Sequence, residues 1–162
     1  MIELLLVAVL FQDPPRYHEG WKGIVPLITK RSEVEKILGI RTECQNSCIY
    51  DIGDDRIFVR YASEPCSKEN DLTVSSGTVT EISVYLGDNP KFSSLKLDRR
   101  KLKKTEDPEL HGYSYYSDDE QGITYTVSER ARLLSIDWWG TADRNLKLLC
   151  PSRPTPRRYK KN

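Results

Sequence analysis

The chain has 162 residues, of which 38% are hydrophobic and 30% charged, a balance typical of one ordinary soluble domain or two very small ones. The net charge is +1, but the last twelve residues carry five basic side chains and no acid, which leaves −4 for residues 1–150. A mildly acidic body argues against a nucleic-acid-binding core. The tail, residues 151–162, also contains three prolines and is expected to be a basic, disordered segment.

The longest apolar run lies near the start of the chain, in residues 4–11, LLLVAVLF. Eight residues are far fewer than the roughly 20 that span a bilayer, but they suit the apolar region of a signal peptide. The basic region that usually precedes it is missing. We therefore interpret residues 1–19 as a truncated signal-like leader and linker, and expect a secreted or periplasmic protein without a transmembrane segment. The alternative is a first strand or a buried N-terminal arm.

The stretch WKGIVPLITKRSEVEKILG predicts one short amphipathic helix. Val34, Ile37 and Leu38 have the spacing of residues that share one helix face. Thr29 is the expected N-cap, and Gly39 suits the left-handed residue that ends a helix. A helix of about ten residues is too short to be stable alone, so its apolar face needs a sheet to pack against.

Four cysteines, Cys44, Cys48, Cys66 and Cys150, form an even set of the kind found in exported proteins. They allow three pairings. We expect Cys66 to pair with Cys150, joining the chain end to a long loop, and Cys44 to pair with Cys48 in a small ring. A zinc site is the alternative, although the cysteine spacing matches no familiar zinc pattern. We expect no metal and no cofactor.

Alternating apolar and polar residues predict two hairpins, each followed by a further strand. The expected strands are 49–52, 57–61, 79–86, 113–116, 123–127 and 133–138. A short helix with Asp98 as its cap is expected within residues 95–104.

The two halves of residues 20–150, 20–90 and 91–150, thus repeat one plan of a helix and three strands. The apolar spacing of their last strands is also alike, in Val79-x-x-Ile82 and Leu133-x-x-Ile136. We expect one α+β domain with an antiparallel sheet, short helices packed on one face, and the halves joined edge to edge as in a degenerate tandem duplication.

The motif W-x-G-I-V-P-L, followed by a helix that ends in L-G, resembles a pattern of uncharacterised exported bacterial proteins. More distantly, it is similar to small outer-membrane assembly lipoproteins of the BamE/SmpA type and to β-lactamase inhibitory proteins, which duplicate that helix-on-sheet unit. The close match covers residues 20–40, with looser support from GTVTEISV and the final LLC. The resemblance implies an exported α+β protein. The chain lacks the lipid-attachment cysteine of the lipoproteins, and no inhibitor contact residue aligns with it.

Residues that could carry catalysis are few. His111 precedes Gly112 at the start of an expected strand, without a nucleophile motif beside it, so we interpret it as a turn histidine. Acidic clusters at 51–55 and 118–120 coincide with expected turns, where aspartate forms local hydrogen bonds, and they lack the spacing of a calcium loop. The basic run at 99–104 is interpreted as a solvated helix face.

Aromatic residues form the sharper signal. Trp138 and Trp139 are adjacent in an expected strand, so their side chains must point to opposite faces of the sheet. If Trp138 faces the helices, Trp139 lies on the other face, where alternation also places Phe58 and Tyr85. We assign these three residues and Tyr115 to a protein-binding face. The alternatives are that helices or loops cover both faces, or that Trp139 caps a sheet edge.

We therefore expect an exported, non-catalytic binding protein or envelope-associated scaffold that binds a protein partner in the cell envelope. The first alternative is a protein inhibitor of a secreted or periplasmic hydrolase. The second alternative is an enzyme of unknown type that uses His111.

Overall fold

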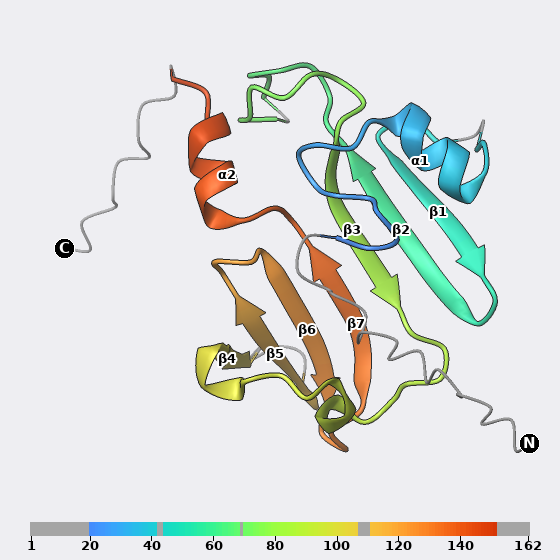
Figure 1. Ribbon diagram of the computed structural model, residues 1–162, viewed down its shortest axis with the longest axis vertical. Helices are drawn as coiled ribbons and strands as arrows, with labels where there is room; N and C mark the ends of the chain where they lie inside the picture. Colours follow the sequence, from blue (N-terminus) through green and yellow to red (C-terminus); the bar gives the residue numbers. More distant parts are fainter. Residues whose placement is uncertain (1–19, 42–43, 69, 107–110, 152–162) are drawn as a thin grey trace, which may run out of the picture.

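The computed structural model describes residues 20–41, 44–68, 70–106 and 111–151. All seven strands of these ranges form one antiparallel sheet in the order β1-β2-β3-β7-β6-β5-β4 (Figure 1). The elements are α1 (Arg31–Leu38), β1 (Ser47–Ile52), β2 (Asp55–Tyr61), β3 (Val79–Tyr85), the 3-10 turns η1 (Phe92–Leu95) and η2 (Arg99–Lys101), β4 (Lys103–Glu106), β5 (Tyr113–Asp118), β6 (Ile123–Ser128), β7 (Leu133–Trp138) and α2 (Ala142–Leu148).

The α+β prediction is confirmed, and so is the joining of two three-stranded units edge to edge. The strands β1-β2-β3 and β5-β6-β7 are consecutive meanders, and their last strands pair antiparallel at the centre of the sheet. Ile82 lies opposite Trp138, and Val84 lies opposite Ile136. Strand β4, which was not predicted, extends the sheet beyond β5. The expected leader (1–19) and all of the tail except Pro151 lie outside the described residues.

The repeated apolar spacing at the start of β3 and β7 has a structural cause. Residues three apart in a regular strand point to opposite faces. Here both members of each pair are buried on the same face, because the pairing register shifts by one residue in the β2–β3 ladder and again in the β6–β7 ladder. The buried pairs are Val79 with Ile82, and Leu133 with Ile136.

One face of the sheet, the covered face, carries the core. Its buried side chains are Cys48, Tyr50, Ile57, Val59, Tyr61, Ile82, Val84, Ile123, Tyr125, Val127, Ile136 and Trp138. Helix α1 lies over β1 and β2 and inserts Val34 into this core (Figure 1). Two details of the predicted helix are wrong: Lys30 is the N-cap instead of Thr29, and Ile37 is 46% exposed. Thr29 instead accepts a hydrogen bond from the backbone N–H of Val25.

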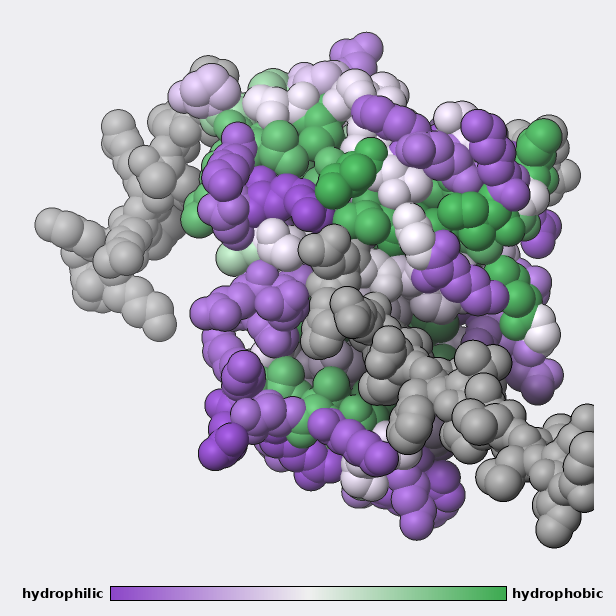
Figure 2. Space-filling model, viewed as in Figure 1, coloured by the Kyte–Doolittle hydropathy of each residue, from purple (hydrophilic) through white to green (hydrophobic). Residues whose placement is uncertain are grey.

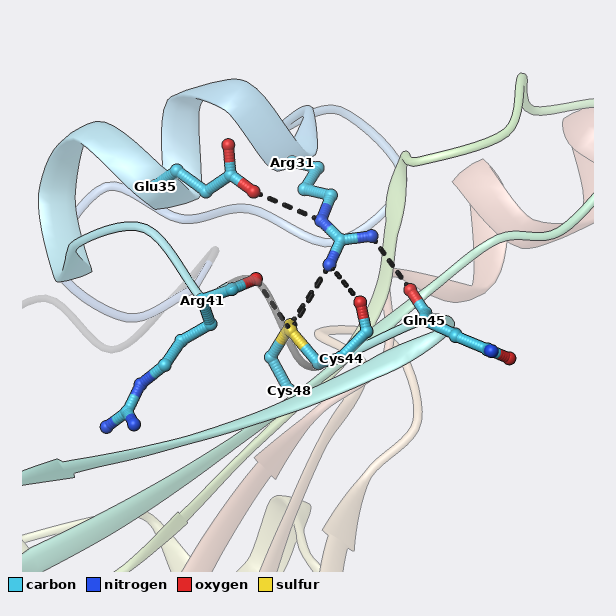
Figure 3. Close-up of polar contacts among 6 residues, drawn as sticks. All are labelled: Arg31, Glu35, Arg41, Cys44, Gln45 and Cys48. Carbon is cyan, nitrogen blue, oxygen red and sulfur yellow. Dashed lines mark hydrogen bonds and ion pairs between the residues drawn. A yellow bond between two sulfur atoms is a disulfide. The ribbon is translucent and has the colours of Figure 1, made fainter.

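Arg31, in the first turn of α1, ties the helix to the loop before β1 (Figure 3). Its guanidinium donates to the backbone carbonyls of Cys44 and Gln45 and forms an ion pair with Glu35. The same loop is closed by the Cys44–Cys48 disulfide, one of the two expected pairings. The short helix is thus held by a charged contact as well as by its single fully buried apolar residue.

The second half contains no α-helix between β3 and β4, where one was expected. Two 3-10 turns occur instead, and the Asp98 carboxylate caps η2 by accepting from the Arg100 N–H, as the sequence predicted for this position. Phe92 covers this half of the core, with its ring centroid 4.8 Å from that of Tyr116. The region around η2 and β4 presents a mainly hydrophilic surface (Figure 2). Leu95, Leu97 and Leu102 nevertheless pack against the core from this stretch, so the two 3-10 turns bury apolar side chains without a full helix.

Helix α2, which was not predicted, lies at the end of the sheet and not on a face (Figure 1). Thr141 caps it, and the second expected disulfide, Cys66–Cys150, joins the segment after it to the loop between β2 and β3. The backbone of this segment also pairs with that loop through Leu72 and Leu149. Within the described ranges, no helix is long and apolar enough to cross a membrane.

Candidate functional site

No helix of the described chain packs on the second face of the sheet, which we call the open face. Strand pairing sets its side chains in two rows that run across six strands. The first row is Ile49, Phe58, Ser83, Asp137, Thr124 and Ser117, and the second is Asp51, Arg56, Tyr85, Ser135, Thr126 and Tyr115. Large apolar side chains remain in contact with solvent here, since Ile49 is 53% and Tyr85 51% exposed.

The four residues predicted to form an interface fall into two groups on this face. Phe58 and Tyr85 lie diagonally on the paired strands β2 and β3. Tyr115 lies three strands from Tyr85, a separation of about 14 Å at ordinary strand spacing. Thr126 and Ser135 occupy the positions between them. The structure therefore places the aromatic side chains around a central area of small polar residues and not in one continuous patch.

Trp139 follows directly after β7, and its backbone continues the ladder. Its N–H donates to the carbonyl of Gly122 at 3.0 Å, so the alternation that places Asp137 on the open face places Trp139 there too. The turn containing Gly122 packs closely against this segment. A Cβ at Gly122 would lie 1.9 Å from the carbonyl oxygen of Gly140, so only glycine fits. Glycine at this position fixes the end of β7 and with it the place of Trp139.

Asp137 lies at the centre of the open face, between Ser83 on β3 and Thr124 on β6. Its carboxylate accepts a hydrogen bond from the Ser135 hydroxyl at 3.2 Å. Burial raises the pKa of Asp137 above the usual carboxyl range; hydrogen bonds from Ser83 and Ser135 oppose this shift, and the nearby charge of Glu81 adds to it.

The arginines of the open face already have partners. Arg60 forms an ion pair with Glu81 at 3.2 Å and lies 5.7 Å from the ring centroid of Phe58. Arg56 pairs with Asp51 at 2.9 Å. These solvent-exposed pairs contribute little to stability, about 1 kcal/mol or less each. They engage the two arginines with Asp51 and Glu81, and neither arginine forms an ion pair with Asp137.

Two members of the open face, Ile49 and Tyr113, were missed by sequence reasoning. Ile49 belongs to a strand in which both Ile49 and Tyr50 are apolar, so alternation alone does not decide which one is buried. Tyr113 is 42% exposed, and its strand, YSYYSD, carries aromatic residues on both faces. Asp137 was placed on this face by alternation, but its isolation from positive charge depends on residues distant in the chain.

His111, the residue of the alternative enzyme hypothesis, lies just before β5 and is exposed. It lines a surface cavity of about 440 Å³ together with Arg99, Lys104, Glu106 and Glu129. No hydrogen bond connects its imidazole with another described residue. The described ranges also contain no group of three His, Cys, Asp or Glu side chains that could hold a metal ion.

Comparison of the chain with protein-family models, curated proteins and solved structures finds no match. The candidate site therefore stands on its own geometry.

Proposed function

We propose that the protein is a secreted or periplasmic binding protein that recognises a protein partner through its open face. The observation that carries this proposal is the exposure of Ile49 and Tyr85 on the regular, unoccupied face of a sheet whose other face forms the core. Phe58, Tyr115 and Trp139 supply further aromatic surface on the same side. The described part of the face holds no group of side chains arranged for catalysis on a bound substrate. Its exposed aromatic and aliphatic side chains can instead bind a partner by surface contact.

The chemical make-up of the face suits protein recognition. Aromatic side chains and arginine dominate the binding energy of protein interfaces. Aromatic side chains bury large areas with few rotatable bonds, and arginine supplies several hydrogen-bond donors on a planar group. Phe58 and Tyr85 are of this kind; Arg60 lies 5.7 Å from the ring centroid of Phe58, and Arg56 lies opposite Tyr85. The serine side chains between the aromatic groups are buried, at 3% exposure for Ser83 and 4% for Ser135, so a partner would contact the exposed rims of Ile49 and Tyr85.

Export is supported by the two disulfides, Cys44–Cys48 and Cys66–Cys150. Disulfides form and persist in oxidising compartments such as the periplasm and the extracellular space, and are rare in the reducing cytosol. The apolar run at residues 4–11 favours the same compartment.

The test is capture of a partner from an extract of the cell envelope, with the oxidised full-length protein as bait. A triple variant, Phe58→Ala with Tyr85→Ala and Trp139→Ala, removes aromatic groups from the open face. A matched control, Ile28→Ala with Ile40→Ala and Leu146→Ala, removes three apolar groups that are 54%, 75% and 70% exposed and lie outside the sheet.

The parent and the control should capture the same protein, and the open-face triple variant should lose it. An interface anchor contributes about 2 kcal/mol or more, which corresponds to a loss of about thirtyfold in affinity for each side chain. Retention of the partner by the open-face variant, or its loss by both variants, would sink the proposal. Coincident urea unfolding curves for all three proteins would show that folding is not the cause.

The inhibitor hypothesis remains a special case of this function. If the captured protein is a hydrolase, its activity should be measured with and without the parent protein. A drop in activity that the open-face variant does not produce would identify an inhibitor, and unchanged activity would identify a scaffold or adaptor.

A further inference from the structure

The open face has one carboxylate, that of Asp137, which forms no ion pair with a residue of the described ranges. Asp137 is partly buried at the centre of the face, where the directly opposed residues are Ser83 and Thr124. Its hydrogen-bond donors are the hydroxyls of Ser135 and Ser83, which are neutral. A half-buried carboxylate satisfied by hydroxyls alone is less stable than one paired with a cation.

The neighbouring charged side chains do not compensate the negative charge of Asp137. Glu81, on β3, adds a second negative charge near Asp137, and Arg60 is engaged with that glutamate at 3.2 Å. Arg56 is engaged with Asp51 at 2.9 Å. The open-face residues of β6 and β5 are threonines, serines and tyrosines, which carry no charge. Lys103 on β4 continues the row of Asp137, but it lies three strands away, about 14 Å at ordinary strand spacing. Among the described residues of β1, β2, β3 and β7, the open face therefore keeps one uncompensated negative charge.

An aromatic ring stands next to this charge. Tyr85 lies diagonally from Asp137 across the β3–β7 pair, opposite Ser135. Burial raises the pKa of Tyr85, and the negative charges of Asp137 and Glu81 raise it further, in keeping with this diagonal placement. The side chains of Ser83 and Ser135 are small and only 3% and 4% exposed, so they do not stand between the Tyr85 ring and the Asp137 carboxylate.

A carboxylate beside an aromatic ring is the arrangement that receives a long cationic side chain. The cation pairs with the carboxylate, and its methylene stem or planar guanidinium lies on the ring. Building on the proposed function, we propose that the partner of the open face inserts a lysine or arginine side chain that pairs with Asp137 and packs on Tyr85.

A library of random linear peptides displayed on phage, selected on the immobilised, oxidised full-length protein, tests this inference. Selected peptides should be enriched in lysine and arginine over the input library. Their affinity should fall about tenfold or more for Asp137→Asn, because the partner's cation loses its counter-charge. Asp119→Asn removes an exposed acid from the β5–β6 turn, so it serves as the matched control and should leave the affinity unchanged.

A double-mutant cycle separates a direct pair from general electrostatic attraction. Replacing the key peptide lysine or arginine by glutamine should cost as much as Asp137→Asn, and the two changes together should cost little more than either alone. Additive losses, or equal losses for Asp137→Asn and Asp119→Asn, would overturn the pairing with Asp137. Unfolding curves of Asp137→Asn that match the parent would exclude misfolding as the cause of a lost affinity.

The two proposals fail in different ways. Peptides that depend on Phe58 and Tyr85 but bind Asp137→Asn as tightly as the parent would overturn the cationic anchor and leave the open face as a binding surface. Peptides that bind independently of both aromatic residues would count against the open face itself. Failure to select any peptide above background on the parent would count against both.

Discussion

The two faces of this sheet carry similar aromatic residues in opposite surroundings. On the covered face, Trp138 is 1% and Tyr125 3% exposed, among aliphatic side chains. On the open face, Tyr85 is 51% exposed, beside Ser83 and near Asp137. The difference shows that aromatic content does not by itself separate a buried face from an exposed one; what covers each face does.

The two faces also differ in the free energy that burial of their aromatic side chains contributes to folding. Removing apolar surface from water contributes about 25 cal/mol per Å². Aromatic side chains of the covered face have made this gain almost fully on folding, whereas Tyr85 and Tyr113 of the open face, 51% and 42% exposed, have made only part of it. Substitutions on the covered face should therefore change the free energy of unfolding, and substitutions on the open face should change binding.

The largest expected effect contrasts two consecutive tryptophans. Trp138→Ala should lower the free energy of unfolding by about 3–5 kcal/mol, since it leaves a cavity in the core, whereas Trp139→Ala should cost about 1 kcal/mol or less. Urea unfolding followed by circular dichroism measures both. Trp138→Phe, which keeps a ring in the core, should fall between the two. Equal losses for Trp138→Ala and Trp139→Ala would mean that the open face is covered after all.

A second contrast lies within α1. Val34 is fully buried and Ile37 is 46% exposed, although the sequence predicted that both would face the sheet. Val34→Ala should destabilise the protein by about 2 kcal/mol, from the lost methyl groups and the cavity that they leave. Ile37→Ala should change stability by about 0.5 kcal/mol or less. Thermal unfolding of the two variants gives the comparison, and a reversed order would show that α1 is rotated about its axis.

The charge of Asp137 should make stability depend on pH. Its folded-state pKa is raised, so between the ordinary carboxyl value of 3.8 and the folded-state value the unfolded chain releases its proton first, and stability falls as pH rises. Asp137→Asn should therefore be at least as stable as the parent at neutral pH. This advantage should vanish as the pH falls below the ordinary carboxyl range. Unfolding midpoints measured across acidic and neutral pH test the sign, and a variant that is less stable at neutral pH would contradict it.

The smallest effect concerns tyrosine ionisation on the two faces. Burial raises the pKa of Tyr61, on the covered face, far above its usual range, while the pKa of Tyr85 is raised partly by Asp137. Asp137→Asn should lower the pKa of Tyr85 and leave Tyr61 un-ionised until the protein unfolds. Ultraviolet titration of tyrosinate, with Tyr85→Phe to assign the signal, measures the shift. A Tyr85 transition that does not move would place the carboxylate farther from the ring.

Several features of this protein followed from the sequence because they depend on near neighbours in the chain. Alternation with a period of two located β1, β2, β3, β5, β6 and β7 and placed Trp138 and Trp139 on opposite faces, since strand geometry acts on consecutive residues. The residues after Thr29 form the expected helix, and Gly39, at a φ of 95°, ends it. The Cys44–Cys48 disulfide, between residues four apart, is local in the same sense; the Cys66–Cys150 disulfide was also expected, but it joins residues 84 apart and depends on the fold.

Other features were decided only by the tertiary structure, because they depend on residues that are distant in the chain. Strand β4 has four exposed residues and exists through its pairing with β5, and α2 is held by the Cys66–Cys150 disulfide and by backbone contacts with residues 71–73. The isolation of Asp137 is of the same kind. Its position on the open face follows from alternation within β7, but its neutral neighbours come from β3 and β6. Only the pairing of those strands brings a lone carboxylate and Tyr85 together.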